Sequence, residues 1–327
     1  MDLSRIYEPV QDGLNEVENR LALVSKVDFA HLAELLSHSL KGGGKRIRPA
    51  LVLLSGRLFG DISESLLNMA MASELFHLAT LVHDDAIDNA DVRHWRPTVN
   101  KIWGLEKAVL LGDYLFANAS ALICLTGNVR VISLFSQTLM TISSGEIGQA
   151  FNAFNLGQTF DDYLWRISRK TAALFSMTTE SGSVLSGAPE EAVQALKEYS
   201  YNFGVGFQIV DDIFDFTVTE EQMGKPVGSD LAQGTLTLPS MLLLERYPED
   251  NPVKRMFQTK GQQDEQEKQQ DIQRATEMVR NSSIVQDCYK VASEYCAKAA
   301  EKMAELPDTP ARRSLTELAN FVVERSR

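Results

Sequence analysis

Three carboxylates lie close together at the end of a long apolar stretch. Asp84, Asp85 and Asp88 follow the run 71–82, which is rich in alanine and leucine and contains no glycine or proline. This run predicts a buried helix, on which Asp84 and Asp88 lie about 40° apart around the axis. Because neighbouring buried carboxylates repel each other and resist desolvation, we expect a cation there. Oxygen-only ligands favour Mg²⁺ over zinc.

A second cluster repeats the pattern more than a hundred residues later. Asp211, Asp212 and Asp215 lie within the segment 207–216, which reads FQIVDDIFDF. Each cluster alone is also typical of a helix end with a solvated acidic face. Two such clusters, each closing an apolar helical run, fit that interpretation poorly because buried unpaired charge is costly. The six aspartates are therefore predicted metal ligands.

Cationic residues occur near both ends of the first acidic helix. The segment 42–49, GGGKRIRP, brings Lys45 and Arg48 behind a flexible turn and before a predicted helix start. Arg93 and His94 follow the first cluster. A basic loop is often only solvated. Cations beside metal-binding acids, however, suit a ligand that carries phosphate as well as metal.

Helical spacing adds further candidates. His77 lies seven residues before Asp84, and Gln208 lies seven before Asp215, so each pair shares a helix face. A histidine at such a position is more often a satisfied core residue, which stays an alternative. Lys170 falls inside a predicted helix, where a lysine is normally solvated.

Composition limits the class of protein. The chain has 327 residues, a net charge of −12 and 44% hydrophobic residues. No basic stripe offsets this charge, so nucleic acid is not an expected partner. Helical spacing recurs throughout and no flexible linker interrupts the chain, which predicts an all-α protein with a single domain over residues 1–327.

The same features bear on location. The three cysteines are scattered, and the first residues are polar and acidic, so we expect a reducing, cytoplasmic setting and no signal peptide. No run of 18 apolar residues is found, so a membrane span is not expected.

The helices that must position these side chains can be located from periodicity. The predicted helices cover residues 5–25, 28–40, 49–59, 64–83, 107–126, 129–154, 163–181, 192–209, 272–304 and 309–326. The strongly polar stretch 260–271 is expected to be an exposed loop or a frayed helix.

Two acidic helix ends facing each other across a bundle could hold several Mg²⁺ ions and a diphosphate. The metal would then turn the diphosphate into a leaving group. No nucleophilic triad, P-loop or dinucleotide-binding fingerprint is found. The expected chemistry is metal-triggered ionisation, with the carbocation shielded by apolar side chains.

The motifs resemble those of the trans-isoprenyl diphosphate synthases, the polyprenyl synthetase family. In family order these motifs are GGGKRIRP, HDDAID, GDYLFANA, GEIGQ, the KTA at 170–172, GFQIVDDIFD, and GKPVGSD with TLP. The resemblance implies an antiparallel helical bundle of the isoprenoid synthase type with a central cavity, and a homodimer. It also implies head-to-tail condensation of isopentenyl diphosphate with an allylic diphosphate, using two to three Mg²⁺ ions.

The resemblance also assigns roles to individual residues. The six aspartates would coordinate Mg²⁺, and Thr171 and Gln208 would lie near the carbocation. The allylic diphosphate would be held by Arg93, Lys170 and Lys225. Isopentenyl diphosphate would be bound by Lys45, Arg48 and His77. The family usually has an arginine where this chain has His94, and a glycine where it has Trp95, so Arg46 and Arg96 are candidate replacements for the lost cation.

Product length is expected to depend on residues below the first cluster. In this family, bulky side chains four and five positions before the first aspartate stop elongation, and here those positions are Thr80 and Ala79. Both are small, which predicts a long product of six or more isoprene units. Phe135 is a candidate floor, although ordinary core packing is the commoner role of such a residue.

Three alternatives remain open on the sequence. They are a shorter-chain farnesyl or geranylgeranyl diphosphate synthase, a class I terpene cyclase, and a non-catalytic partner subunit of another synthase. A cyclase would not need the segment 42–49 or a second full cluster, and a non-catalytic subunit would be expected to lose acids. The apolar product suggests at most transient membrane contact.

Overall fold

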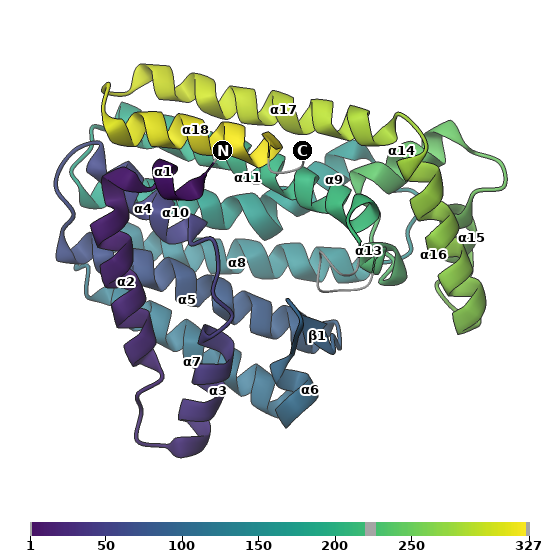
Figure 1. The fold of residues 1–327 in the computed structure, drawn as a ribbon, viewed down its shortest axis with the longest axis horizontal. Helices are drawn as coiled ribbons and strands as arrows, with labels where there is room; N and C mark the ends of the chain where they lie inside the picture. Colours follow the sequence, from purple (N-terminus) through teal and green to yellow (C-terminus); the bar gives the residue numbers. More distant parts are fainter. Residues whose placement is uncertain (1, 220–226, 325–327) are drawn as a thin grey trace.

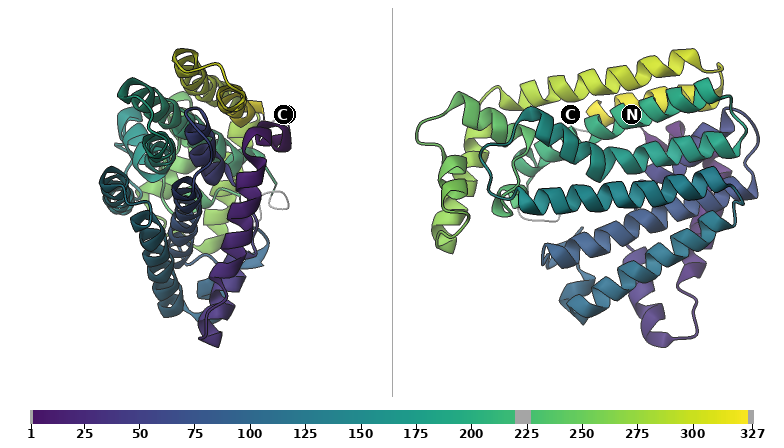
Figure 2. Two further views of the ribbon diagram at one scale, coloured as in Figure 1. Left: turned by 90° about the vertical axis from the view of Figure 1, so that its left-hand side faces the viewer. Right: turned by 180° about the vertical axis from the view of Figure 1, so that it is seen from behind.

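Long apolar runs without internal proline fold into helices that pack side by side, mostly antiparallel (Figures 1 and 2). The structure is a computed structural model and describes residues 2–219 and 227–324. The first half contains α1 (Leu3–Ile6), α2 (Gln11–Val24), α3 (Ala30–Leu40), α4 (Ile47–Arg57), α5 (Glu64–Ile87), α6 (Val99–Trp103), α7 (Leu105–Cys124) and α8 (Val129–Phe151). The second half contains α9 (Phe160–Ile167), α10 (Ala173–Leu185), α11 (Glu190–Thr217), α13 (Ser229–Ala232), α14 (Leu238–Arg246), α15 (Pro252–Gln258), α16 (Glu265–Arg280), α17 (Ile284–Lys302) and α18 (Pro310–Glu324).

The core forms around α4, α5, α10 and α11. Helix α4 packs against α5 and α10, and α10 packs against α11. Every residue of α4 from Pro49 to Gly56 is buried, so most of this short helix lies inside the bundle. The side chain of Ser63 caps α5 by accepting a hydrogen bond from the Leu66 N–H, which fixes where that helix begins. The predicted all-α fold is confirmed.

Differences from the predicted helices have local causes. The segment predicted as one helix over 163–181 contains a π-helical turn, η2 (Ser168–Ala172), between α9 and α10. The segment predicted over 272–304 is interrupted at 281–283, where the Ser282 hydroxyl accepts a hydrogen bond from the Ile284 N–H and starts a new helix. Helix α16 already begins at Glu265, inside the stretch expected to be irregular or frayed.

One β-hairpin departs from the helical pattern. The strands β1 (Val92–Arg93) and β2 (Arg96–Pro97) pair antiparallel directly after the first acidic cluster. The two turn residues, His94 and Trp95, have φ angles of 47° and 64°. Two-residue hairpin turns require such left-handed backbone, which glycine and asparagine adopt most easily.

Two helices are long and apolar enough to span a membrane by length and composition, α5 and α7. In α5 most of the apolar window is buried inside the bundle, whereas in α7 only 33% is buried. Core packing accounts for the apolar character of α5. Core packing does not account for the exposed apolar residues of α7, among them Leu105 and Leu110.

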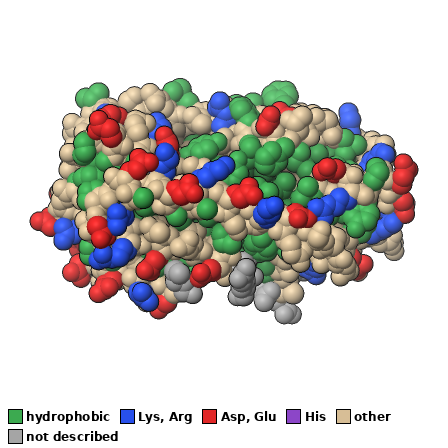
Figure 3. All heavy atoms as spheres, turned by 90° about the horizontal axis from the view of Figure 1, so that it is seen from above, with side chains coloured by type: hydrophobic (Ala, Val, Ile, Leu, Met, Phe, Trp, Pro, Cys, Tyr) green, Lys and Arg blue, Asp and Glu red, His purple; other side chains and the backbone are tan. Residues whose placement is uncertain are grey.

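The face formed by α17, α18 and their neighbours carries mixed charge. In Figure 3, lysine and arginine side chains alternate with aspartate and glutamate among apolar patches, and no continuous basic stripe crosses this face.

Close approach of α4 and α10 generates the first prediction. A Cβ atom at Gly182 would lie 2.2 Å from Ser55 Oγ and 2.4 Å from the Val52 carbonyl oxygen. We expect Gly182→Ala to lower the free energy of unfolding by about 1–3 kcal/mol through overpacking, although alanine favours helix more than glycine does. Urea denaturation measures this difference.

The matched control is Gly60→Ala, because a Cβ at Gly60 meets nothing within 4 Å. Its free energy of unfolding should stay within about 0.5 kcal/mol of the parent. Equal stability of Gly182→Ala and the parent would show that α4 and α10 can separate at little cost.

Candidate active site

The first acidic cluster closes α5. Asp84 and Asp85 lie in its last turn, and Asp88 is its C-terminal cap. The C-terminal end of a helix carries partial negative charge, so carboxylates are disfavoured there. Burial raises the pKa of Asp84 to about 6, against the opposing influence of the Lys170 ammonium. Asp85, which is 7% exposed, accepts a hydrogen bond of 2.8 Å from Arg93 Nε.

The second cluster lies in the last two turns of α11. Asp212 is 3% exposed, and its two oxygens accept hydrogen bonds from the Tyr163 hydroxyl, at 2.7 Å, and from Gln208 Nε2, at 2.8 Å. Burial raises the pKa of Asp212 to about 7, and nearby Asp230 adds to this rise. Asp215 accepts hydrogen bonds from the Ser229 hydroxyl and the Asp230 N–H at the start of α13.

The π-helical turn η2 connects the two clusters. Lys170 Nζ lies 2.8 Å from Glu146 Oε1 and interacts electrostatically with Asp84 and Asp88. The next residue, Thr171, donates a hydrogen bond of 2.5 Å to Gln208 Oε1 on α11. Adjacent residues of one turn therefore face different clusters, and the structure brings the two acidic helix ends to one region. Short π-helical insertions are often found at functional sites.

A glycine makes room for this turn. A Cβ at Gly145 of α8 would lie 2.9 Å from Arg169 Cβ and 3.5 Å from the Lys170 N atom. Any larger side chain at this position would push η2 away from α8. Gly145, the first glycine of the GEIGQ motif, thus allows η2 and Lys170 to pack close to α8.

The donor set fits divalent metal that is shared with a phosphate ligand. Among residues 2–219 and 227–324, no three carboxylate, imidazole or thiolate side chains are placed to hold one ion by themselves. Mg²⁺ in proteins usually takes one or two carboxylates, and substrate phosphates complete its coordination. Burial raises the pKa of Asp84, Asp85 and Asp88, and a bound cation would favour their charged forms. The metal-binding roles of the six aspartates stay predictions.

The predicted isopentenyl diphosphate residues lie around the start of α4. Arg48 stacks on the Phe175 ring at 4.6 Å, and its buried Nε has no hydrogen-bond partner in the described chain. Burial lowers the pKa of Arg48 to about 10, opposed by Glu74 and Asp211. Lys45 is exposed, with Nζ 5.9 Å from the centre of the Phe321 ring.

The two histidines of this region both have a lowered pKa, which favours the neutral form of each ring. Burial lowers the pKa of His77 well below its usual range, and Arg48 and Arg93 act in the same direction. Burial also lowers the pKa of His94, as does Arg93, whereas Asp85 opposes the shift. His94 is therefore no cationic substitute for the arginine that usually follows Arg93 in the family.

The two candidate replacement cations, Arg46 and Arg96, each contact other side chains of the protein. Arg46 has a φ of 48° and forms ion pairs with Glu18 and Glu74. Arg96 Nη2 lies 3.4 Å from His38 Nδ1. Lys225, predicted to hold the allylic diphosphate, lies outside the described residues.

The predicted chain-length residues lie in the core below the first cluster. Ala79 is fully buried, and the Thr80 hydroxyl donates a hydrogen bond to the His77 carbonyl. The Phe135 ring centre lies 5.0 Å from that of Phe76, which in turn lies 5.2 Å from that of Phe116. Phe135, the candidate floor residue, therefore packs in a cluster with Phe76 and Phe116, which the sequence analysis did not name.

Several contributors were missed by sequence reasoning. Tyr163 and Glu146 contact predicted site residues, and a hydrogen bond from Gln233 counteracts the burial that raises the pKa of Asp88. Tyr163 lies seven residues before Lys170, a helical spacing that could have indicated it. Glu146 and Gln233 are separated from their partners by many residues, so no local pattern could have predicted those contacts.

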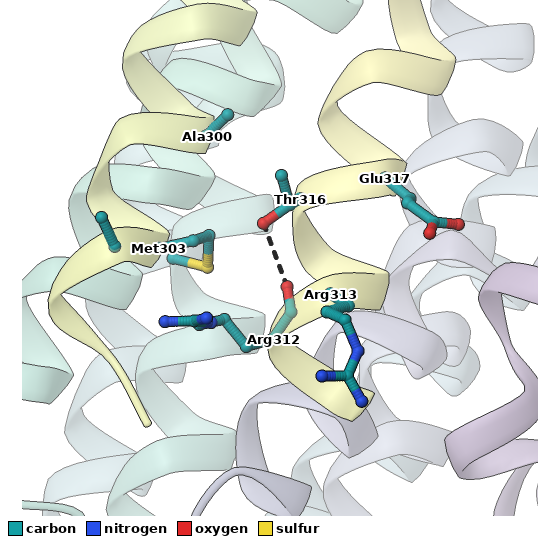
Figure 4. A pocket seen from close by; sticks show the side chains of 7 residues that line it. Ala300, Met303, Arg312, Arg313, Thr316 and Glu317 are labelled. Carbon is teal, nitrogen blue, oxygen red and sulfur yellow. Dashed lines mark hydrogen bonds between the residues drawn. The ribbon is translucent and has the colours of Figure 1, made fainter. Parts of the chain in front are cut away.

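A surface pocket lies elsewhere, between the end of α17 and the start of α18 (Figure 4). It is lined in part by Met303, Arg312 and Thr316. Arg312 already donates to the Leu306 carbonyl and pairs with Asp308, so its guanidinium serves the helix–helix connection. The pocket contains none of the predicted site residues.

Comparison with known proteins identifies the family of this chain. The polyprenyl synthetase family model matches residues 29–279. This chain belongs to the polyprenyl synthetase family. It is a polyprenyl diphosphate synthase, and therefore a prenyltransferase.

Relatives cover the whole chain. Heptaprenyl diphosphate synthase component 2 of Geobacillus stearothermophilus is 37% identical over 99% of each chain. Geranylgeranyl diphosphate synthase of Saccharolobus solfataricus is 35% identical over 99% of this chain and 98% of its own. The polyprenyl synthase of Caulobacter crescentus, solved with calcium and isoprenyl diphosphate, is 31% identical with a TM-score of 0.93, covering 100% of this chain and 98% of its own.

Proposed function

We propose that this enzyme is Mg²⁺-dependent and joins isopentenyl diphosphate head-to-tail to an allylic diphosphate, giving an all-trans polyprenyl diphosphate and pyrophosphate. The observation that carries the proposal is the turn η2, which sets Lys170 toward the first acidic cluster and Thr171 toward the second. The Caulobacter relative, whose structure contains calcium and isoprenyl diphosphate, supports a site for divalent metal and diphosphate.

Residues around the first acidic cluster would bind and ionise the allylic diphosphate. Lys170 and Arg93 carry the positive charge that binds the allylic diphosphate beside the first cluster. Bound Mg²⁺ would neutralise the diphosphate and make it a better leaving group. The buried apolar side chains below the cluster, among them Ala79 and Phe76, exclude water from the allylic cation.

The second substrate is bound on the α4 side. Lys45 and Arg48 supply charge for isopentenyl diphosphate, and neutral His77 offers a hydrogen bond without adding charge. The isopentenyl double bond attacks the allylic cation, and a proton then leaves to the departing pyrophosphate. This step needs no nucleophilic side chain from the protein.

The activity test uses the purified chain with farnesyl diphosphate, radiolabelled isopentenyl diphosphate and Mg²⁺. We expect condensation that EDTA abolishes. Asp84→Ala and Asp211→Ala should each lower kcat by at least about 100-fold, since each removes a carboxylate that would hold the Mg²⁺ acting on the leaving group. Asp28→Ala, on the exposed surface, should match the parent.

The other outcomes of this test identify the alternatives. A hydrocarbon product formed without isopentenyl diphosphate would indicate a terpene cyclase. An inactive chain would favour function with a partner subunit. The Geobacillus relative is named component 2 of a heptaprenyl diphosphate synthase, which indicates such an arrangement for that protein. Full activity in both cluster variants would contradict the proposed mechanism.

We propose a product of six or more isoprene units. The proposal is supported by the small side chains of Thr80 and Ala79, above the aromatic cluster of Phe76, Phe116 and Phe135. The relatives named above differ in product length, so the length must be measured.

Replacing Ala79 by phenylalanine should shorten the product because the added ring occupies the path of the growing chain. Reversed-phase chromatography of the dephosphorylated products measures the length. Thr80→Ser keeps a small side chain and should leave the distribution unchanged. The same distribution from Ala79→Phe and the parent would exclude Ala79 as a determinant of length.

We also propose a homodimer formed through the outer faces of α7 and α8, onto which the right-hand view of Figure 2 looks. Apolar side chains are exposed there, and such patches commonly mark interfaces. They are Leu105, Val109 and Leu110 of α7 and Val129, Met140, Ile147 and Phe151 of α8.

Sedimentation equilibrium tests the dimer. The parent should have twice the chain mass of 36.4 kDa, and Met140→Lys should shift it toward that of one chain. Leu23→Lys changes a side chain of similar exposure on α2 and should leave the dimer intact. A monomeric parent would refute the proposal.

A further inference from the structure

A buried chain of hydrogen bonds runs from α9 through α11 to η2. The Tyr163 hydroxyl donates to one oxygen of Asp212 at 2.7 Å. Gln208 Nε2 donates to the other oxygen at 2.8 Å, and Gln208 Oε1 accepts from the Thr171 hydroxyl at 2.5 Å. All four residues come from packed helices, and Tyr163 is fully buried.

The direction of each bond in this chain follows from the atoms that face each other. Gln208 presents its NH₂ group, which can only donate, to Asp212. Its carbonyl oxygen then points to Thr171, whose single hydroxyl hydrogen is used in that bond.

This direction decides what Thr171 offers to a ligand. Because its hydrogen points to Gln208, only oxygen lone pairs remain on the hydroxyl. Its neighbour Lys170 interacts with Asp84 and Asp88, where the diphosphate would bind. A lone pair near the carbon that loses the diphosphate would stabilise developing positive charge, whereas a hydroxyl hydrogen there would oppose it.

We infer that Tyr163 and Asp212 are positioning residues that orient Gln208 and Thr171, so that oxygen lone pairs face the allylic carbon as its bond to the diphosphate breaks. This inference rests on the proposed function. It also gives Asp212 a role different from the metal ligand that the sequence predicts. Both of its oxygens accept hydrogen bonds from the protein, and only 3% of the residue is exposed.

The test is a double-mutant cycle on kcat with saturating substrates and Mg²⁺, using Tyr163→Phe, Thr171→Val and both together. Each single variant should lose about 10- to 100-fold in kcat, the usual cost of removing a group that orients a reacting one. The KM values for both substrates and the half-saturating Mg²⁺ concentration should change less than about threefold. Because both residues act through one chain, the double variant should be no slower than Thr171→Val alone.

The matched control is Tyr199→Phe. The Tyr199 hydroxyl is also fully buried and donates a 2.6 Å hydrogen bond, but to the Leu315 carbonyl on α18. Tyr199 lies on α11 about two and a half turns before Gln208. Loss of the Tyr199 hydroxyl should leave kcat unchanged. A loss in Tyr199→Phe equal to that in Tyr163→Phe would show a general packing effect and overturn the inference.

Other outcomes separate this inference from the proposed function. A parent enzyme that forms no polyprenyl diphosphate refutes the proposed function, whereas an active parent with an equally active Tyr163→Phe refutes only the inference. If Tyr163→Phe raised the half-saturating Mg²⁺ concentration tenfold or more at unchanged kcat, Asp212 would be identified as a metal ligand. Independent, multiplicative effects of the two substitutions would also overturn the inference.

If Tyr163→Phe does not fold, Thr171→Ser and Thr171→Val test the same chain. Serine keeps the hydroxyl that donates to Gln208 and should stay within about threefold of the parent kcat, while valine should lose about 10- to 100-fold. Equal losses in both variants, or no loss in either, would contradict the inference.

Discussion

Buried negative charge at two helix ends is the constraint on which this structure depends. The carboxyl end of a helix already carries partial negative charge, and here each of two long helices, α5 and α11, adds aspartates to it. Burial raises the pKa of Asp84 and of Asp212, so the folded protein holds these charges at a cost. The surrounding elements reduce that cost: η2 brings Lys170, the hairpin brings Arg93, and α13 brings the Ser229 hydroxyl and the Asp230 N–H to Asp215.

The cations are distributed according to the same constraint. In the segment before α4, Arg46 pairs with Glu18 and Glu74, whereas Arg48, two residues later, lies in the interior on Phe175. The left-handed backbone at Arg46 turns the chain between them. Charge that looks continuous in the sequence is therefore divided into one residue that anchors the turn and one that can meet a ligand.

Much of this arrangement could be predicted from the sequence, and the rest could not for physical reasons. Apolar periodicity located α5, α8 and α11, because each helix buries one face over many turns. The spacing of Asp84 and Asp88 is local and could be read directly. The contact of Gln233 with Asp88 and the pairing of Glu146 with Lys170 depend on tertiary packing. The π-helical turn η2 was missed because its five residues, SRKTA, differ little in propensity from those of an ordinary helix.

The hairpin that follows the first cluster links conformational strain to charge. At its tip, His94 and Trp95 both adopt the left-handed conformation, which costs a non-glycine residue about 1–2 kcal/mol of conformational energy. The Trp95 side chain is 61% exposed, so its packing offsets little of this cost. The anchors of the hairpin are the hydrogen bonds of Thr98 to Ala90 and Asp91 and the contact of Arg93 with Asp85. One of these anchors therefore depends on ionisation of Asp85, and a ligand that competes for Arg93 would also weaken the attachment of the hairpin to α5.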